Sequence, residues 1–280
     1  MKTVGKIKDL KTELMTWQGQ TIGFIPTMGC LHMGHISLVK KAKEQCDRVV
    51  VSVFVNPTQF NESHDFESYP KNLQDDEEKL KPYGVDLIFA PSQSEMYGST
   101  HNQSTVVPGA LANGLCGNDR PGHFTGVATV VLKLLNIITP SKIYMGKKDY
   151  QQYLIIKQMV IDLNMDVEVI GVETLRELDG LAMSSRNVHL NGEQRKKANM
   201  IREQLLILSQ KINKTKTEAI RAQLIKSWQA LEEAGFEVDY LSICNPMTLE
   251  EIEGQINKPV VVLCAARIGS TRLIDNLECL

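Results

Sequence analysis

The chain has 280 residues, of which 31 are basic and 33 acidic, so the formal net charge is −2. This length permits one large domain or a large and a small one, and the balanced charge argues against a partner as acidic as nucleic acid. The start of the chain has no apolar signal region and no run of about 18 apolar residues occurs, so we expect a cytoplasmic protein that does not span a membrane.

The first part of the chain alternates short apolar runs with helical patterns. Runs rich in β-branched residues indicate buried parallel strands, and helical spacing falls between them. The expected strands are residues 21–26, 48–55, 85–90, 143–145 and 167–172, and the expected helices are residues 36–46, 126–138 and 150–163. This order predicts an α/β domain with a parallel sheet, whose ligands bind beyond the carboxyl ends of the strands.

The pattern changes after about residue 175. Two amphipathic helices are expected at residues 198–212 and 220–231, followed by strands at 236–244 and 259–265. We therefore predict a larger α/β domain at residues 1–175 and a smaller α+β domain at residues 176–280.

Two histidines flank a glycine just after the first predicted strand, in the segment PTMGCLHMGH at residues 26–35. Residues three apart share one face of a helix, so His32 and His35 can point toward one ligand. A helix N-terminus adds backbone N–H groups and the positive end of a dipole, which suits phosphate, and Gly29 lets a ligand approach the backbone. The histidines could instead cap a turn, but the pair around a glycine favours a phosphate site.

A second polar segment, GKKDYQQ at residues 146–152, follows the predicted strand 143–145. Lys148 can neutralise charge that grows on phosphate oxygens, and Asp149 can hold Mg²⁺ together with phosphates. Taken alone, these three residues favour a solvated Lys-Lys-Asp turn.

Two more segments have side chains suited to ligands. In the segment FVNPTQF, Asn56 and Gln59 offer donors and acceptors for a substrate with hydroxyl and carboxylate groups, although an Asn-Pro turn is the simpler interpretation. The segment MSSRN at residues 183–187 supplies hydroxyls and a cation to meet a triphosphate, or else is a polar connection between domains.

These segments together carry a resemblance to a known family. The His-x-Gly-His pattern resembles the HIGH motif of the nucleotidylyl-transferase superfamily, and residues 183–187 resemble its downstream KMSKS-type loop. With the C-terminal segment ARIGSTRLIDN at residues 266–276, the ordered set resembles the pantoate–β-alanine ligase family over nearly the whole chain. Cys30 departs from the pattern, because family members commonly carry alanine there.

The resemblance implies a Rossmann-like N-terminal domain, a C-terminal lid domain and a homodimer. It implies that pantoate, β-alanine and ATP are the partners, that Mg²⁺ accompanies ATP as co-substrate, and that the reaction passes through pantoyl-adenylate. The implied catalytic residues are His35, His32, Lys148 and Arg186, and the implied substrate-binding residues are Gln59 and Gln152. From their own chemistry, Asn56 is a further substrate-binding candidate and Asp149 a candidate metal ligand together with phosphates. The implied ATP-binding residues are Met28, Gly29, Cys30, Leu31, His32, Met33, Gly34, His35, Gly146, Lys147, Lys148, Asp149, Leu175, Met183, Ser184, Ser185 and Arg186.

Neither the cysteines nor the C-terminal arginines indicate a further site. The six cysteines have no C-x-x-C spacing, which is typical of reduced thiols rather than of disulfides or a zinc site. The C-terminal arginines, Arg267 and Arg272, have no assigned role.

A nucleotidylyltransferase that releases pyrophosphate without an amine acceptor, or a nucleotide-binding regulatory module without turnover, would also fit parts of the pattern.

Overall fold

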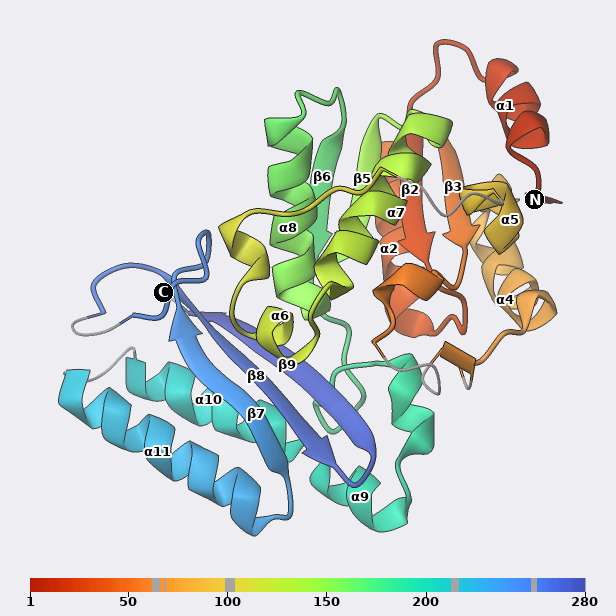
Figure 1. Ribbon diagram of the computed structural model, residues 1–280. Coiled ribbons are helices and arrows are strands. Elements are labelled where there is room, and N and C mark those ends of the chain that lie inside the picture. Colours follow the sequence, from red (N-terminus) through yellow and green to blue (C-terminus); the bar gives the residue numbers. More distant parts are fainter. Residues whose placement is uncertain (62–65, 68, 99–103, 213–216, 253–255, 280) are drawn as a thin grey trace. The chain divides into compact units, whose positions relative to one another are not determined.

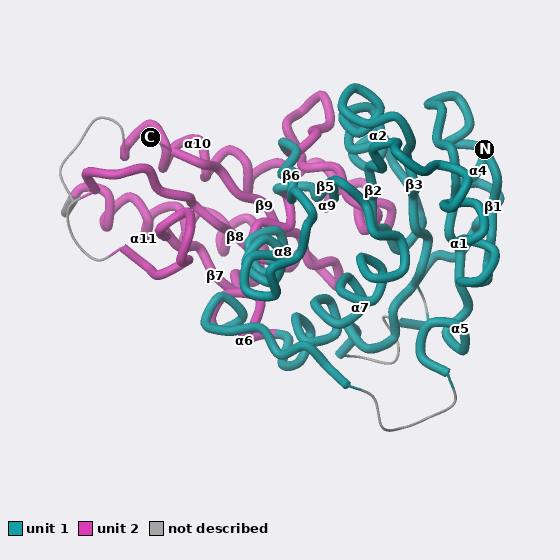
Figure 2. The backbone as a smooth tube through the Cα atoms, turned by 90° about the horizontal axis from the view of Figure 1, so that it is seen from above, with its two compact units in different colours: residues 1–113, 120–147, 152–173 teal, residues 114–119, 148–151, 174–280 magenta. Residues whose placement is uncertain are grey.

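The computed structural model describes residues 1–61, 66–67, 69–98, 104–212, 217–252 and 256–279. They form two compact units (Figure 2). Unit 1 comprises Met1–Asn113, Arg120–Lys147 and Gln152–Glu173, and unit 2 comprises Gly114–Asp119, Lys148–Gln151 and Thr174–Leu280. Unit 2 therefore begins at Thr174 and also includes two short segments from earlier in the chain. Within the described ranges, no helix has both the length and the apolar character needed to cross a membrane.

Unit 1 is built on a six-stranded parallel sheet in the order β1-β4-β3-β2-β5-β6. Figure 1 labels four of these strands, in the order β3, β2, β5 and β6. From β2 the chain moves outward through β3 and β4, then crosses to the other side of β2 to form β5 and β6. The expected α/β class is confirmed, and the point where the strand order reverses lies between β2 and β5. The strands are β1 (Lys2–Val4), β2 (Ile22–Thr27), β3 (Arg48–Val53), β4 (Leu87–Phe89), β5 (Lys142–Gly146) and β6 (Glu168–Val172).

Helices and short 3₁₀ turns connect these strands. The α-helices are α1 (Ile7–Met15), α2 (Met33–Gln45), α4 (Leu73–Leu80), α5 (Gln93–Tyr97), α7 (His123–Ile138) and α8 (Tyr150–Asp162), whose first two residues belong to unit 2. The 3₁₀ turns are η1 (Pro57–Gln59), η2 (Lys81–Tyr83), η3 (Ala110–Ala112) and η4 (Lys147–Asp149). Helix α2 begins three residues before the predicted start at residue 36, because His32 caps it.

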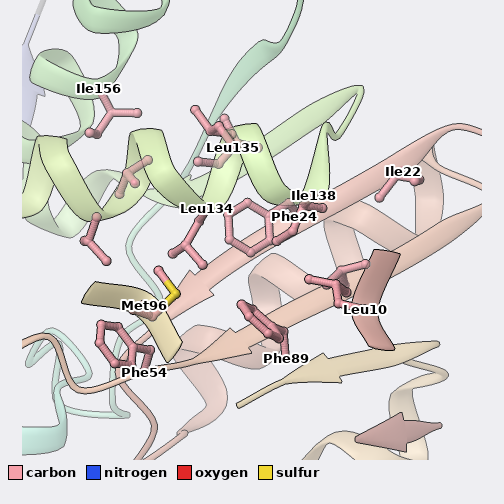
Figure 3. Close-up of a cluster of buried hydrophobic side chains, with 14 of the residues drawn as sticks. Leu10, Ile22, Phe24, Phe54, Phe89, Met96, Leu134, Leu135, Ile138 and Ile156 are labelled. Atoms are coloured by element: carbon pink, nitrogen blue, oxygen red, sulfur yellow. The ribbon is translucent and has the colours of Figure 1, made fainter. Parts of the chain in front are cut away.

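The central strands of the sheet, β2 to β5, are buried on both faces, which explains why they are continuous apolar runs in the sequence. Successive residues of β2 point to opposite sides, so Phe24 and Ile25 enter different cores. The core around Phe24 includes Leu134 and Ile138 of α7 (Figure 3). The core around Ile25 includes Ile36 and other apolar residues of α2. This double-sided burial fixes the carboxyl ends of the strands, from which the predicted site loops emerge.

Unit 2 contains a three-stranded antiparallel sheet in the order β7-β8-β9. One face packs on α10, through residues such as Leu205 and Leu208. Strand β9 was not predicted, because Asp275 and Asn276 interrupt its apolar pattern although both are buried. The elements are α6 (Cys116–Asp119), η5 (Ser185–His189), α9 (Gly192–Lys197), α10 (Met200–Ile212), α11 (Thr217–Glu233), β7 (Glu237–Cys244), β8 (Val260–Ile268) and β9 (Thr271–Cys279).

Candidate active site

The two histidines of the His-x-Gly-His segment form the N-terminal cap of α2. His32 is the N-cap residue, and its Nδ1 accepts a hydrogen bond from the Gly34 N–H at 3.1 Å. In return, His35 Nδ1 accepts one from the His32 N–H at 3.3 Å, which completes a capping box. The two rings lie 4.1 Å apart, measured between centroids. The histidines are therefore adjacent, as the spacing predicted, but His32 is in extended backbone outside the helix and two of the expected N–H groups already have partners.

This capping geometry sets the tautomer of both rings. A ring nitrogen that accepts a hydrogen bond carries no proton, so a neutral His32 or His35 has its proton on Nε2. Each ring then presents an Nε2–H donor, which suits an anionic oxygen better than it suits a cation. The arrangement can bind phosphate while the same rings stabilise the helix start.

Asp76 of α4 holds the turn that precedes these histidines. Its carboxylate accepts the backbone N–H groups of Cys30 at 3.0 Å and of Leu31 at 2.7 Å, and only 1% of the residue is exposed. A Cβ at Gly29 would come within 2.8 Å of Asp76 Oδ2, and Gly29 has a φ of +82°, so both space and conformation require glycine. One buried carboxylate therefore fixes the backbone conformation of residues 29–31.

Cys30, which stands where the family commonly has alanine, is part of this turn. Its φ of 51° lies in the left-handed region, which is uncommon for a residue other than glycine. Burial and then the nearby Asp76 carboxylate raise the pKa of the Cys30 thiol. The thiol is thus protonated at neutral pH and is no activated nucleophile.

Gln59 of η1 lies against the same loop. Its Nε2 donates to Met28 Sδ at 3.0 Å, and its Oε1 accepts from Asn56 Nδ2 at the same distance. Asn56 is 1% exposed and also bonds the carbonyl of Gly126 and the hydroxyl of Tyr97. The structure therefore brings Gln59 to the predicted ATP loop, while the Asn56 amide is engaged in holding Gln59.

Sequence reasoning missed two residues that fix the backbone of Gln59. His123 Nδ1 lies 2.8 Å from the Gln59 carbonyl oxygen, and Arg120 Nη2 donates to the same oxygen at 3.2 Å. Gly126, one turn into α7, allows this close approach, because a Cβ there would lie 2.3 Å from the Thr58 carbonyl oxygen. The segment RPGHFTG contains these residues, but nothing in its spacing pointed to η1.

The residues after β5 lie on the other side of the switch point. Gly146 ends β5, which pairs with β2, so Gly146 and Thr27 end neighbouring strands of the sheet. Lys147 Nζ forms an ion pair with Glu173 at 2.7 Å. Gln152, half-buried, lies in the first turn of α8. Unit 1 therefore places part of the GKKDYQQ segment at the edge where ligands of such sheets bind.

Lys148 and Asp149 belong to unit 2. Lys148 Nζ lies 3.8 Å from Asp149 Oδ2, and the Asp149 side chain is 49% exposed. Within the described ranges, no group of three or more His, Cys, Asp or Glu side chains could hold a metal ion. A single accessible carboxylate fits Mg²⁺ that arrives with phosphates, since Mg²⁺ in such sites keeps waters and takes one or two carboxylates. It does not fit a metal held by the protein alone.

The predicted loop at residues 183–187 follows a short hairpin of unit 2, in which Arg176 pairs with Ala182. The Met183 N–H donates to the Leu175 carbonyl at 3.0 Å, so these two predicted ATP-binding residues are neighbours. Ser184 caps η5, because its Oγ accepts the Arg186 N–H at 3.2 Å. Ser185 and Arg186 therefore lie at the start of η5, beside the hydroxyl of Ser184.

The arrangement gathers the predicted residues into two groups. Unit 1 brings Gln59 against the loop at residues 28–35, with Gly146 and Lys147 at the same edge of the sheet. Unit 2 brings Leu175 next to Met183 and holds Lys148 through its backbone. Between them, the two units carry N–H donors, cations and amides, which are groups that can stabilise charge on phosphate oxygens.

Comparisons with known proteins agree with this chemistry. The family model described as "Pantoate-beta-alanine ligase" matches residues 2–278. The pantothenate synthetase of Shewanella sp. (strain ANA-3) is 45% identical, over 99% of both chains. A crystal structure of the enzyme from Thermus thermophilus superposes with a TM-score of 0.91 at 43% identity, covering 99% of both chains. A Francisella tularensis pantoate–β-alanine ligase structure, described as a complex with β,γ-ATP and β-alanine, has a TM-score of 0.81 at 38% identity and covers 99% of this chain and 97% of its own.

Proposed function

This chain belongs to the pantoate–β-alanine ligase family, and we infer that it condenses pantoate with β-alanine in an ATP-dependent reaction that forms pantothenate. The observation that carries this function is the match over residues 2–278 combined with the paired histidines at the switch point of a parallel sheet. The homologous ligase whose structure is described with a nucleotide and β-alanine supports ATP and β-alanine as substrates.

We propose that the reaction passes through pantoyl-adenylate. A carboxylate is a poor acyl donor, so its oxygen must first become part of a leaving group. The pantoate oxygen attacks the α-phosphate of ATP and pyrophosphate leaves; the amine of β-alanine then attacks the acyl carbon and AMP leaves. No enzyme group needs to be acylated, and the raised pKa of Cys30 agrees with such a mechanism.

The roles of the side chains follow from their chemistry. The Nε2–H groups of His32 and His35 would donate to phosphate oxygens, and Lys148 and Arg186 would meet the charge that develops as pyrophosphate leaves. Gln59 and Gln152 would hold pantoate, with Asn56 keeping Gln59 in place. Positioning of the reactants can supply about 7 to 11 kcal/mol of the rate enhancement. His35 need not transfer a proton in this scheme.

The remaining ATP contacts would be made by the turn at residues 28–34, by Gly146 and Lys147, and by Leu175 and residues 183–185. Asp149 would hold Mg²⁺ together with the phosphates, and the ion would supply charge neutralisation on their oxygens. We further propose that residues 1–175 and 176–280 act as a nucleotide- and pantoate-binding domain and a lid, in a cytoplasmic homodimer.

Product analysis tests this function. With pantoate carrying ¹⁸O in its carboxylate, the complete reaction should release AMP that contains one labelled oxygen, together with pyrophosphate. An acyl-phosphate mechanism would release ADP and put the label in orthophosphate. Pyrophosphate release that does not depend on pantoate, or that gives no amide when β-alanine is present, would instead indicate a nucleotidylyltransferase of another specificity.

A further inference from the structure

The C-terminal strand β9 contacts other parts of unit 2 with polar side chains from both of its faces. Alternate residues of a strand point to opposite sides. Arg272, Asn276 and Glu278 share one side, and each bonds a residue from the segments 114–119 or 148–151. Asp275 points to the other side, toward Arg176. Asp275 and Asn276 are buried, which is costly for polar side chains without partners, and both are hydrogen-bonded.

On the first side, β9 contacts the segment at residues 148–151. Asn276 Nδ2 donates to the Lys148 carbonyl oxygen at 2.9 Å, and Asn276 is 7% exposed. Two residues further along β9, Glu278 Oε1 accepts from the Tyr150 hydroxyl at 2.9 Å. Next to this, Gln151 bonds the Cys116 N–H at 3.1 Å. Each residue from Lys148 to Gln151 other than Asp149 is therefore tied by a hydrogen bond to a distant part of the chain.

On the second side of β9, Asp275 contacts Arg176. Arg176 belongs to the hairpin that precedes residues 183–186. Asp275 accepts two hydrogen bonds from the Arg176 guanidinium, at 2.7 and 2.9 Å, and is 5% exposed. Arg176 bridges to Ala182 across the hairpin, and Met183 follows directly. A bidentate pair of this kind fixes orientation as well as distance.

We propose that Asn276 and Asp275 are positioning residues for the ligase reaction: Asn276 fixes the backbone of Lys148, and Asp275 fixes the hairpin that leads to Arg186. Because the two residues are consecutive in β9, this one strand fixes the positions of both the Lys148 segment and the hairpin that leads to Arg186. This inference rests on the proposed roles of Lys148 and Arg186, and it gives the C-terminal LIDN segment a function that its sequence alone did not suggest.

The two neighbouring arginines, Arg267 and Arg272, pair with carboxylates of the protein itself. Arg272 donates to Asp239 at 2.6 Å and to Asp119 at 2.9 Å, and Arg267 lies 3.7 Å from Asp239. Both arginines thus neutralise carboxylates of unit 2. Arg272 holds α6 to the strand that carries the positioning pair.

The test is a double-mutant cycle between Asn276 and Lys148. Asn276→Ala should lower kcat about 10- to 100-fold, because small displacements of a catalytic group cost that much, while the KM for pantoate changes little. In the Lys148→Ala background the same substitution should cost less than about 2-fold, since its effect is exerted through that lysine. Losses that multiply in the double variant would overturn the proposal.

Controls separate this proposal from the function on which it rests. Ser242→Ala removes a buried side-chain hydrogen bond of the same sheet, to Glu251 at 2.6 Å, and should leave kcat unchanged. If Lys148→Ala is fully active, the assignment of the nucleotide site fails; if Lys148→Ala is impaired but Asn276→Ala is not, only the positioning role fails. Where Asn276→Ala does not fold, the isosteric Asn276→Asp, which has no N–H donor, replaces it in the same cycle.

Asp275 has its own arm of the experiment. Asp275→Asn keeps the shape of the side chain but weakens the pair with Arg176, so it should raise the KM for ATP about 10-fold with a smaller change in kcat. The melting temperature of each variant is measured alongside. An unchanged KM for ATP in a folded Asp275→Asn protein would contradict the role assigned to Asp275.

Discussion

The loop at residues 28–35 and the segment at residues 148–151 are held by different kinds of contact. In the loop, His32 and His35 bond backbone groups within three residues of themselves, and Asp76 and Gln59 add contacts from two distant elements. In the segment, Lys148 is held by Asn276, 128 residues further along the chain, and Tyr150 by Glu278. The first arrangement is set mainly by local sequence, and the second depends on the complete fold of unit 2.

This difference predicts where function and stability separate. Side chains that face the ligand in either region should affect catalysis with little effect on folding. Side chains that hold the backbone should affect both, to a degree that depends on their burial. The following changes test the comparison, from the largest expected effect to the smallest.

Lys148→Ala should give the largest loss of activity. The Lys148 ammonium forms a long ion pair with Asp149, at 3.8 Å. Such a pair contributes little to stability, so the substitution should have little effect on folding. If Lys148 meets the developing phosphate charge as proposed, its loss should lower kcat about 100- to 1,000-fold. Lys142→Ala, at the opposite end of β5, is the matched control, and steady-state kinetics with thermal unfolding compare the two. Equal activity of both variants would contradict the role of Lys148.

Asp76→Ala should combine a loss of stability with weaker ATP binding. It leaves the N–H groups of Cys30 and Leu31 buried without their partner, which should lower the free energy of unfolding by about 2 to 4 kcal/mol. The neighbouring Asp75 is 46% exposed and pairs with Lys79, so Asp75→Ala should cost less than about 1 kcal/mol. Urea unfolding measures both variants. Similar values for the two would show that Asp76 does not organise the turn.

Gln152→Ala should affect one substrate only. If Gln152 holds pantoate, loss of its amide should lower kcat/KM for pantoate about 10- to 100-fold and leave the KM for ATP nearly unchanged. Gln158→Ala on the same helix removes a hydrogen bond to Asp162 at 2.7 Å and serves as the control. Equal weakening of both substrates would place Gln152 in a different pocket.

The pH dependence of stability should distinguish two carboxylates of unit 1, the buried Asp76 and the half-buried Asp86. Burial raises the pKa of Asp76 above its ordinary value of 3.8, against the opposing N–H groups of Leu31 and Cys30. Burial acts in the same direction on Asp86, but the Val49 N–H, Arg48 and Lys43 together hold the pKa of Asp86 below 3.8. The stabilisation linked to Asp86 is present above the pKa of the unfolded state and is lost as the pH falls through the pKa of the folded state. The stabilisation linked to Asp76 has the opposite dependence: it is present below the unfolded-state pKa and is lost as the pH rises through the folded-state pKa.

Unfolding measured between about pH 2 and pH 6 checks this contrast. Asp86→Asn should flatten the loss of stability on the acid side, below the ordinary aspartate pKa. Asp76→Asn should remove a decline of opposite sign, above that pKa. The same sign of change in both variants would show that the surroundings of the two carboxylates have been misassigned.

The sequence predicted well what depends on local pattern. Buried parallel strands are apolar runs in the sequence, so the α/β class followed, and the i, i+3 spacing of His32 and His35 placed both rings together. Strand β9 could not be predicted, because Asp275 and Asn276 break the apolar alternation for reasons visible only when Arg176 and Lys148 are folded against them. Asp76 was missed for the same reason, since nothing distinguishes it from the exposed Asp75 until the loop is in place.

The most direct test of the account is isotope exchange in the absence of β-alanine. The proposed chemistry separates activation of pantoate from amide formation, so the enzyme with Mg-ATP and pantoate alone should exchange labelled pyrophosphate into ATP. Omitting pantoate should abolish the exchange, because the attacking oxygen belongs to that substrate. Exchange that proceeds without pantoate, or ADP as the product of the complete reaction, would contradict the acyl-adenylate mechanism.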